Sequence, residues 1–223
     1  MDWSEYNKWF RWHFQREFKD FVSFIIHELD IDYNARVLEI DSGTGWVSLE
    51  LGRRMPDTEI VGLEPNAELV TIANQNKIQE KITNTYFVTN DYENLKTFAN
   101  QSFDCIISFK GLRQWNSPLQ VLNEINRILK KEGTYAITDY RKDLKRLAKA
   151  SLWFTGKTVP KDFRSYWKEM IVSSYSLEEI VKILLQTKLK DWKIRTTLFD
   201  FLIYKPKPGN FNRETRSSQK ASG

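Results

Sequence analysis

The sequence is poor in cysteine. Cys105 is the only cysteine among 223 residues, so an internal disulfide and a thiolate metal cluster are both excluded. It lies inside the apolar run from Phe103 to Phe109, where a buried structural thiol is expected. We therefore predict that the protein holds no metal.

The chain also lacks a long apolar run. No segment has the uninterrupted apolar length that a membrane span requires. Charged residues interrupt the apolar positions of the N-terminal region, and the small-residue cleavage pattern of a signal peptide is missing. These absences predict a cytoplasmic protein without a membrane span.

Acidic residues are scarce at the C-terminal end. From Lys205 onward the chain has five basic residues against one acid, Glu214, and this segment carries most of the formal net charge of +5. The pI near 9.1 is therefore weak evidence for nucleic-acid binding, and we do not favour a nucleic-acid partner. Residues 207–223 are predicted to form a disordered basic tail. No feature of the sequence indicates an oligomeric state.

Aromatic residues are concentrated in the first thirty residues. They recur at steps of three and four, which places them on one face of a helix. The face consists of Trp3, Tyr6, Phe10, Phe14, Phe18, Phe21 and Ile25. We predict an aromatic helix over residues 1–30, which either packs against the domain or closes over a ligand as a lid.

Short apolar runs alternate with helical patterns along the next hundred residues. Strands are predicted over 37–40, 59–63, 85–88, 103–109 and 134–138, and helices over 46–55, 67–76 and 118–129. The basic residues before Gly133 predict the end of the third of these helices, with the glycine as its cap. This alternation implies a parallel sheet covered on both faces.

The pattern changes after residue 140. Helical patterns around 142–154 and 177–185 predict an insertion over about 141–190. Two strand-like runs then follow over 193–199 and 201–205, too close together for a helical crossover, so they should pair as an antiparallel hairpin. The predicted fold class is α/β, a Rossmann-like doubly wound sheet of seven mostly parallel strands with an antiparallel last strand, over residues 31–206.

A glycine-rich turn joins the first predicted strand to the helix after it. Gly43 and Gly45 allow close backbone approach, and the helix start offers free N–H groups to a ligand. Glu64 ends the second strand, about twenty residues on, where it can accept hydrogen bonds from ribose hydroxyls. A dinucleotide fingerprint requires a third glycine where this chain has Ser48, which disfavours a nicotinamide oxidoreductase.

The run from Val37 to Gly45, VLEIDSGTG, resembles the first motif of class I S-adenosylmethionine-dependent methyltransferases. The likeness is greatest to the small-molecule group that includes ubiquinone-biosynthesis methyltransferases (type 11), and it extends over residues 36–140. It includes the run EINRILKKEG before the fifth strand. The resemblance implies S-adenosylmethionine as cofactor, bound by residues of the strand ends. These are Glu39, Asp41, Ser42, Gly43, Gly45, Glu64, Pro65, Asn90, Asp91, Tyr92, Phe109 and Lys110.

The central motif departs from the family at one position. Asp41 stands where the family usually has glycine. Its carboxylate could accept a hydrogen bond from the ammonium group of the cofactor, or it could repel the cofactor's carboxylate and crowd the pocket. The departure bears on cofactor affinity and not on the fold.

The sequence does not identify a catalytic base, and methyl transfer does not require one, because alignment and water exclusion supply most of the effect. Candidate bases are Asp139, Tyr140 and His13. The Asn-Pro-Pro-aromatic motif of enzymes that methylate bases or glutamine is absent after the fourth strand, which favours a small-molecule acceptor, apolar or aromatic. Candidate acceptor-site residues are Trp9, Trp12, Arg113, Trp153 and Tyr166.

Two alternatives to a small-molecule methyltransferase remain open from the sequence. A binding or regulatory protein with a degenerate site is suggested by Asp41 and by the lack of an evident base. A nucleic-acid methyltransferase is suggested only by the basic tail.

Overall fold

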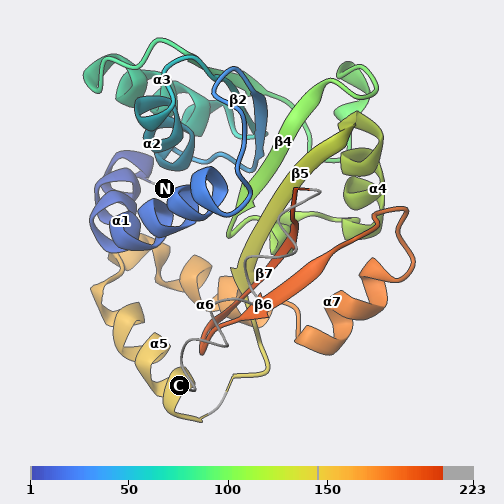
Figure 1. Ribbon diagram of the computed structural model, residues 1–223. Coiled ribbons are helices and arrows are strands. Elements are labelled where there is room, and N and C mark those ends of the chain that lie inside the picture. Colours follow the sequence, from blue (N-terminus) through green and yellow to red (C-terminus); the bar gives the residue numbers. More distant parts are fainter. Residues whose placement is uncertain (1, 145, 208–223) are drawn as a thin grey trace, which may run out of the picture.

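A seven-stranded sheet with the order β3-β2-β1-β4-β5-β7-β6 forms the centre of the protein. The structure is a computed structural model that describes residues 2–144 and 146–207 (Figure 1). The strands are β1 (Arg36–Ile40), β2 (Glu59–Glu64), β3 (Thr85–Thr89), β4 (Phe103–Phe109), β5 (Leu129–Tyr140), β6 (Lys193–Thr196) and β7 (Asp200–Lys205). The first five pair in parallel, whereas β7 is antiparallel to both of its neighbours. The predicted fold class and its terminal hairpin are confirmed.

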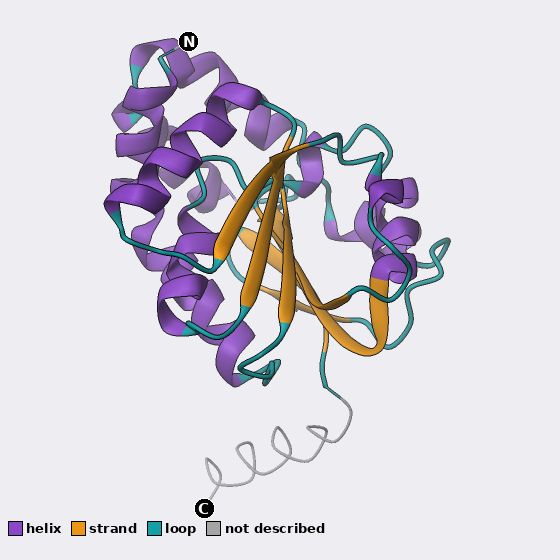
Figure 2. Ribbon diagram, turned by 90° about the horizontal axis from the view of Figure 1, so that it is seen from above, coloured by secondary structure: helices purple, strands orange, loops and turns teal. Residues whose placement is uncertain are grey.

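Helices cover both faces of this sheet (Figures 1 and 2). The helices are α1 (Trp3–His27), α2 (Trp46–Arg54), α3 (Ala67–Gln79), α4 (Pro118–Ile128), α5 (Arg146–Thr158), α6 (Arg164–Val172) and α7 (Leu177–Leu184). Short 3₁₀ turns lie at η1 (Leu95–Thr97), η2 (Leu112–Gln114) and η3 (Lys161–Phe163). α1 to α3 lie on one side of the sheet, and α4 and α7 lie on the other.

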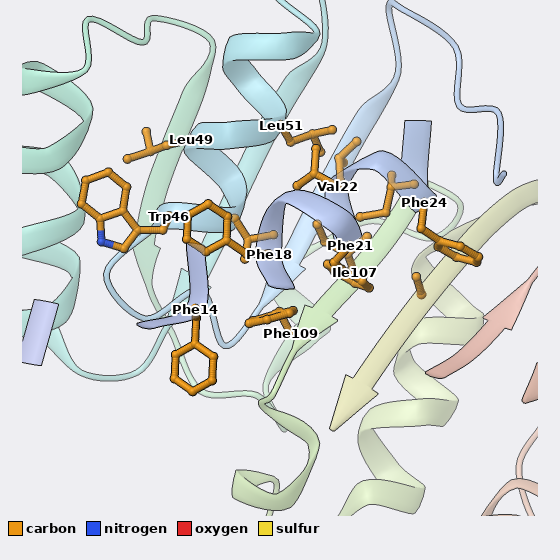
Figure 3. Close-up of a cluster of buried hydrophobic side chains, with 14 of the residues drawn as sticks. Phe14, Phe18, Phe21, Val22, Phe24, Trp46, Leu49, Leu51, Ile107 and Phe109 are labelled. Carbon is orange, nitrogen blue, oxygen red and sulfur yellow. The ribbon is translucent and has the colours of Figure 1, made fainter. Parts of the chain in front are cut away.

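The strands are buried on both faces, and their side chains alternate between two hydrophobic clusters. In β1, Val37 belongs to the cluster under α1 and α2, whereas Leu38 belongs to the cluster under α4 and α7. In β4, Ile107 and Phe109 face α1. The α1 aromatics pack directly over them (Figure 3), and the ring centroids of Phe21 and Phe109 are 5.4 Å apart. The aromatic face of the N-terminal helix is thus largely core.

Two features of the sheet and its insertion differ from the sequence prediction. Gly133 does not cap a helix: α4 ends at Ile128, and Gly133 lies within β5. A Cβ at Gly133 would lie 2.9 Å from the backbone oxygen of Asp104, so the glycine is needed for close strand contact. The insertion also contains η3 and α6, for which no helix was predicted.

None of the helices within the described residues is long and apolar enough to cross a membrane. The segment 207–223, for which a disordered tail was predicted, lies outside the described residues except for Lys207.

Candidate functional site

The site is built at the point where β2 and β4 lie on opposite sides of β1, so that the loops after β1 and β4 diverge. The loop after β1 contains three left-handed residues, with φ of 64° at Asp41, 52° at Gly43 and 85° at Gly45. A Cβ at Gly45 would lie 2.5 Å from the ring of Phe87, so only glycine fits there. At Gly43 no atom lies within 4 Å of that position. The loop therefore has free space for a ligand beside Gly43, whereas the Phe87 ring fills the space beside Gly45.

Glu64, at the end of β2, holds this loop in place. Its carboxylate accepts hydrogen bonds from the backbone N–H of Gly43 (3.1 Å) and of Asn66 (2.9 Å). Asn66 in turn caps α3, since its side chain accepts from the N–H of Glu68. Burial, followed by the charge of the neighbouring Asp41, raises the pKa of Glu64 to about 8.

Asp41 lies beside Glu64 and reaches toward the other loops of the site. Its carboxylate accepts hydrogen bonds from the Tyr92 hydroxyl (2.6 Å) and the Gln114 side-chain amide (3.0 Å). It also lies against Gly111, where an added Cβ would overlap it. Burial raises the pKa of Asp41, and its carboxyl is hydrogen-bonded to that of Glu64. The two acids therefore share one charge more readily than they carry two.

A cavity of about 150 Å³ lies between this loop and α1. That is smaller than the roughly 300 Å³ at the lower end of ordinary ligand pockets, so α1 closes tightly over the loop. Its lining residues come from α1, from the ends of β1, β2 and β4 with the loops after them, and from α2, α3 and η2. They are Trp3, Tyr6, Phe10, Phe14, Glu39, Asp41, Ser42, Gly43, Thr44, Trp46, Val47, Glu64, Asn66, Leu69, Phe109, Lys110, Arg113 and Gln114.

Asn7 ties α1 to the glycine-rich loop. Its side-chain oxygen accepts from the Trp46 indole N–H (2.7 Å) and from the amide of Asn76 (3.0 Å). Asn76, on α3, also donates to the backbone oxygen of Thr44 (2.9 Å). This network fixes the helix over the loop by polar contacts, which the aromatic periodicity of α1 did not reveal.

Two buried hydroxyls in the cavity wall lack hydrogen-bond partners within the described part of the chain. They are the Ser42 Oγ and the Thr44 Oγ1, whose residues are 6% and 3% exposed. Buried polar groups normally have partners, and an unpaired one costs free energy. Their position beside the open Gly43 and the Glu64 carboxylate fits a polar ligand at this loop.

The predicted bases are engaged by other residues. Asp139 forms a buried ion pair with Arg113 at 2.7 Å, and it also accepts from the backbone N–H of Arg113 and Tyr140. Burial raises the pKa of Tyr140 well above its usual value, and the Lys110 ammonium lies 3.8 Å from the centre of its ring. Burial lowers the pKa of His13, whose ring stacks on Trp9.

Lys110 and Arg113 line the cavity, but their charges point to other partners. The Lys110 ammonium is 2.5 Å from Asp200 and 3.4 Å from Glu17. Arg113 bonds the backbone oxygen of Lys110 as well as Asp139. These two cations therefore brace the loop after β4.

Of the predicted cofactor residues, seven line the cavity: Glu39, Asp41, Ser42, Gly43, Glu64, Phe109 and Lys110. The other five do not line it, namely Gly45, Pro65, Asn90, Asp91 and Tyr92. Asn90 bonds the backbone oxygen of Asn94 and the hydroxyl of Thr97. All twelve assignments to cofactor binding stay predictions.

The structure does not gather the predicted acceptor residues around the cavity. Arg113 lines it, but Trp9 is buried against Trp167, Trp12 is 73% exposed, and Trp153 lies at a separate groove. The side chain of Tyr166 lies outside the described part of the structure.

Sequence reasoning missed Asn7 and Gln114. Gln114 follows closely on the strand-end run that was considered, whereas no local pattern identifies Asn7.

We expect the buried Glu39 carboxyl to make the stability of the folded protein depend on pH. Burial raises the pKa of Glu39 from 4.5 to about 8, although the Ser48 hydroxyl donates a hydrogen bond to it. Between these pH values the unfolded chain loses the Glu39 proton and the folded protein retains it, so stability falls as pH rises. We expect Glu39→Gln to remove this contribution, so that its Tm relative to the unchanged protein rises by roughly 5 °C or more between pH 5 and pH 8. Differential scanning fluorimetry across this range measures it, and parallel profiles would show that Glu39 ionises normally.

The comparison with known families agrees with the geometry of the site. A family model described as a methyltransferase domain matches residues 31–201. The chain belongs to this family. The resemblance predicted from the glycine-rich motif is thereby confirmed.

Two relatives of this chain are named as a demethylmenaquinone methyltransferase and a ubiquinone/menaquinone biosynthesis C-methyltransferase. Demethylmenaquinone methyltransferase of Thermotoga maritima is 33% identical over 131 residues, which cover 58% of this chain and 52% of that protein. Ubiquinone/menaquinone biosynthesis C-methyltransferase UbiE of Blochmanniella pennsylvanica is 28% identical over 176 residues, covering 78% and 69%. The match to the first of these relatives thus spans about half of its length.

Solved methyltransferase structures share the fold. A putative S-adenosyl-L-methionine-dependent methyltransferase of Methanococcus maripaludis superimposes with a TM-score of 0.72 at 21% identity, covering 91% of each chain. The plantazolicin methyltransferase BpumL in complex with SAH gives a TM-score of 0.71 at 16% identity, covering 92% of this chain and 90% of that one. At these identities the likeness establishes the fold.

Proposed function

We propose that this protein transfers a methyl group from S-adenosylmethionine to a small apolar or aromatic acceptor. The observation that carries the proposal is the polar wall beside Gly43, which contains the Glu64 carboxyl and the buried Ser42 and Thr44 hydroxyls that lack partners within the described residues. The quinone-methylating relatives and the methyltransferase family support the same activity.

The residues around the cavity fit this cofactor by their chemistry. Glu64 at the end of β2 is a hydrogen-bond acceptor for ribose hydroxyls, and the loop from Asp41 to Gly43 offers backbone and hydroxyl groups to the amino-acid end. When bound, the cofactor supplies a methyl group on a positively charged sulfur. The chain itself aligns the two reactants and keeps water away from them.

The aromatic helix α1 provides the apolar wall opposite these polar groups. Tyr6, Phe10 and Phe14 line the cavity from α1, and Phe109 lines it from β4. We extend the proposal to the domain division: residues 1–30 act as a lid, and the insertion over about 141–190 supports the lid from the side, since Phe163 packs against Tyr6 at 5.0 Å. An aromatic wall favours an aromatic or apolar acceptor over a charged one.

A thermal-shift titration with S-adenosylmethionine, S-adenosylhomocysteine and NAD tests the cofactor assignment. A ligand that binds only the folded protein raises its Tm by mass action. We expect a rise with the two adenosyl compounds and none with NAD. No rise with either adenosyl compound at millimolar concentration would overturn the proposal and favour the degenerate, non-catalytic alternative.

Asp41→Asn is expected to increase the affinity for S-adenosylhomocysteine about tenfold at pH 7, a change of about 1.4 kcal/mol. The substitution removes the charge that helps to raise the pKa of Glu64, so more of Glu64 is a carboxylate able to accept strong hydrogen bonds. Isothermal titration calorimetry measures the affinity.

Asp57→Asn is the matched control, because Asp57 is an exposed carboxylate before β2 and lies outside the cavity. Asp41→Gly, which also relieves the left-handed backbone, should bind at least as tightly as Asp41→Asn. A loss of affinity in both Asp41 variants would instead show that Asp41 accepts a hydrogen bond from the ligand.

A further inference from the structure

A second hollow lies away from the cofactor cavity, between α5 and α6. Its volume is about 800 Å³, within the range of roughly 300–1,000 Å³ that is typical of ligand pockets. Its lining residues come from the segment after β5, from α5 and from α6. They are Lys142, Leu144, Leu152, Trp153, Gly156, Lys157, Arg164, Trp167, Lys168 and Val172. We call this hollow the α5–α6 groove.

The floor of the α5–α6 groove is apolar and well packed. Leu144, Leu152 and Trp167 are all buried, and the Trp167 indole donates to the backbone oxygen of Leu152. Gly156 lets α5 approach Trp167 closely, because a Cβ there would lie 3.1 Å from the Trp167 ring. The floor therefore offers a fixed apolar surface.

The mouth of the groove exposes large apolar side chains to solvent. Trp153 is 59% exposed and Val172 is 77% exposed. Phe154, beside Trp153 on α5, is also exposed, and the two rings meet edge to face at 5.0 Å. An apolar surface of this kind, continuous with a buried floor, is typical of a binding site rather than of an ordinary protein surface.

The charged residues of the groove are all basic. Lys142, Lys157, Arg164 and Lys168 line it, and no acidic residue does so among the described residues. Lys142 is paired with Glu179 at 2.6 Å. Among the residues that the structure describes, the other three form no ion pair.

The rim cations are held by neutral partners instead of acids. The Lys157 ammonium lies 3.9 Å from the centre of the Trp153 ring, and Arg164 donates to the backbone oxygens of Lys157 and Val159. Their positive charge is therefore uncompensated by carboxylates of the groove, and it is complementary to an anion.

We propose that the α5–α6 groove binds a single-chain amphiphile, with its aliphatic chain on the Leu152–Trp167 floor and its anionic head group at Lys157 and Lys168. An apolar floor alone would accept a neutral hydrocarbon, and a basic rim alone would accept any small anion. Their combination selects a fatty-acid-like molecule. The site is separate from the cofactor cavity: Trp167 stands between them, and its ring packs against Phe14 of the cavity wall at 6.3 Å.

Calorimetric titration of the full-length chain with octanoate, decanoate and dodecanoate below their micelle concentrations tests the floor. Each buried methylene should raise affinity roughly fourfold, so that each step of two carbons raises it roughly tenfold or more. Dodecanol tests the basic residues at the edge of the groove. It should bind more weakly than dodecanoate, because it has the same chain length but no negative charge. Equal binding of the three carboxylates would overturn the role of the floor. The titration is carried out without cofactor, so its result does not depend on the proposal of methyl transfer.

The paired substitution Lys157→Glu and Lys168→Glu tests the head-group site with exposed residues whose change does not disturb the core. We expect it to weaken dodecanoate binding about tenfold or more. The matched control is Lys19→Glu with Lys96→Glu, which changes the net charge equally at exposed positions outside the groove. If the control pair weakened dodecanoate binding equally, the effect would come from net charge alone. The head-group site at Lys157 and Lys168 would then be overturned.

Vesicles that contain anionic lipid distinguish a monomeric amphiphile from a membrane surface. We expect soluble dodecanoate to compete with any vesicle binding. Sedimentation with vesicles in the absence of dodecanoate binding in solution would overturn the proposal in favour of a membrane surface.

Discussion

Replacing Arg113 with methionine is expected to destabilise the folded protein by about 3–5 kcal/mol. Arg113 and Asp139 form an ion pair whose side chains are 4% and 1% exposed. Methionine retains an apolar chain of similar length but leaves the Asp139 carboxylate buried without its cation. Urea unfolding followed by circular dichroism measures the free energy of unfolding.

Arg141→Met is the matched control for this prediction. Arg141 pairs with Asp143 at 2.8 Å, but this pair lies near the surface, where ion pairs contribute about 1 kcal/mol or less. If both variants lost a similar free energy of unfolding, the burial of the Arg113–Asp139 pair would not explain the effect. Because Arg113 also bonds the backbone oxygen of Lys110, the methionine variant should loosen the loop after β4 as well.

Replacing Glu64 with alanine is expected to lower the affinity for S-adenosylhomocysteine roughly 100-fold. Two hydrogen bonds from ribose hydroxyls to a charged acceptor would be lost, each of about 1.5–3 kcal/mol before compensation by water. The backbone N–H groups of Gly43 and Asn66 would also lose their acceptor, so the loop would be less ordered. Isothermal titration calorimetry at pH 8 measures the affinity.

Glu68→Ala serves as the control, because Glu68 is an exposed carboxylate in the first turn of the same helix, α3. Glu64→Gln separates charge from shape and should fall between the alanine variant and the unchanged protein. A single cooperative thermal transition at pH 8 would show that Glu64→Ala folds. If a folded Glu64→Ala variant bound S-adenosylhomocysteine with unchanged affinity, Glu64 would not bind the ribose of the ligand.

Most of the α/β frame could be predicted from local pattern. Strands β1 and β4 are short apolar runs bounded by turn residues, and their pairing follows from the helix between successive strands. The terminal hairpin followed from the short spacing between β6 and β7. Gly133 shows the limit of this reasoning, since a basic run before glycine fits a helix end as well as a crowded strand.

The candidate site could be predicted only where it is contiguous in sequence. The loop from Asp41 to Gly45 and the acid at Glu64 were identified because one strand–turn–helix unit positions each of them. Asn7 was missed, because its partners Trp46 and Asn76 are far from it along the chain. Arg113 was named as an acceptor residue, but its ion pair with Asp139 on β5 was not predicted, because the two residues are also far apart along the chain.

The sequence by itself determined the order of the strands and of α1 to α4 along the chain, the glycine-rich turn and the aromatic face of α1. These features depend on residue periodicity and on backbone preference, both of which act over a few residues. Only the tertiary structure decided that the aromatic face covers the β4 end of the sheet, that the Asp41 and Glu64 carboxyls meet in a buried site, and that α5 and α6 enclose a basic-rimmed groove. Each of these depends on packing between segments distant in the chain, where burial sets the cost of a charge and the partners available to it.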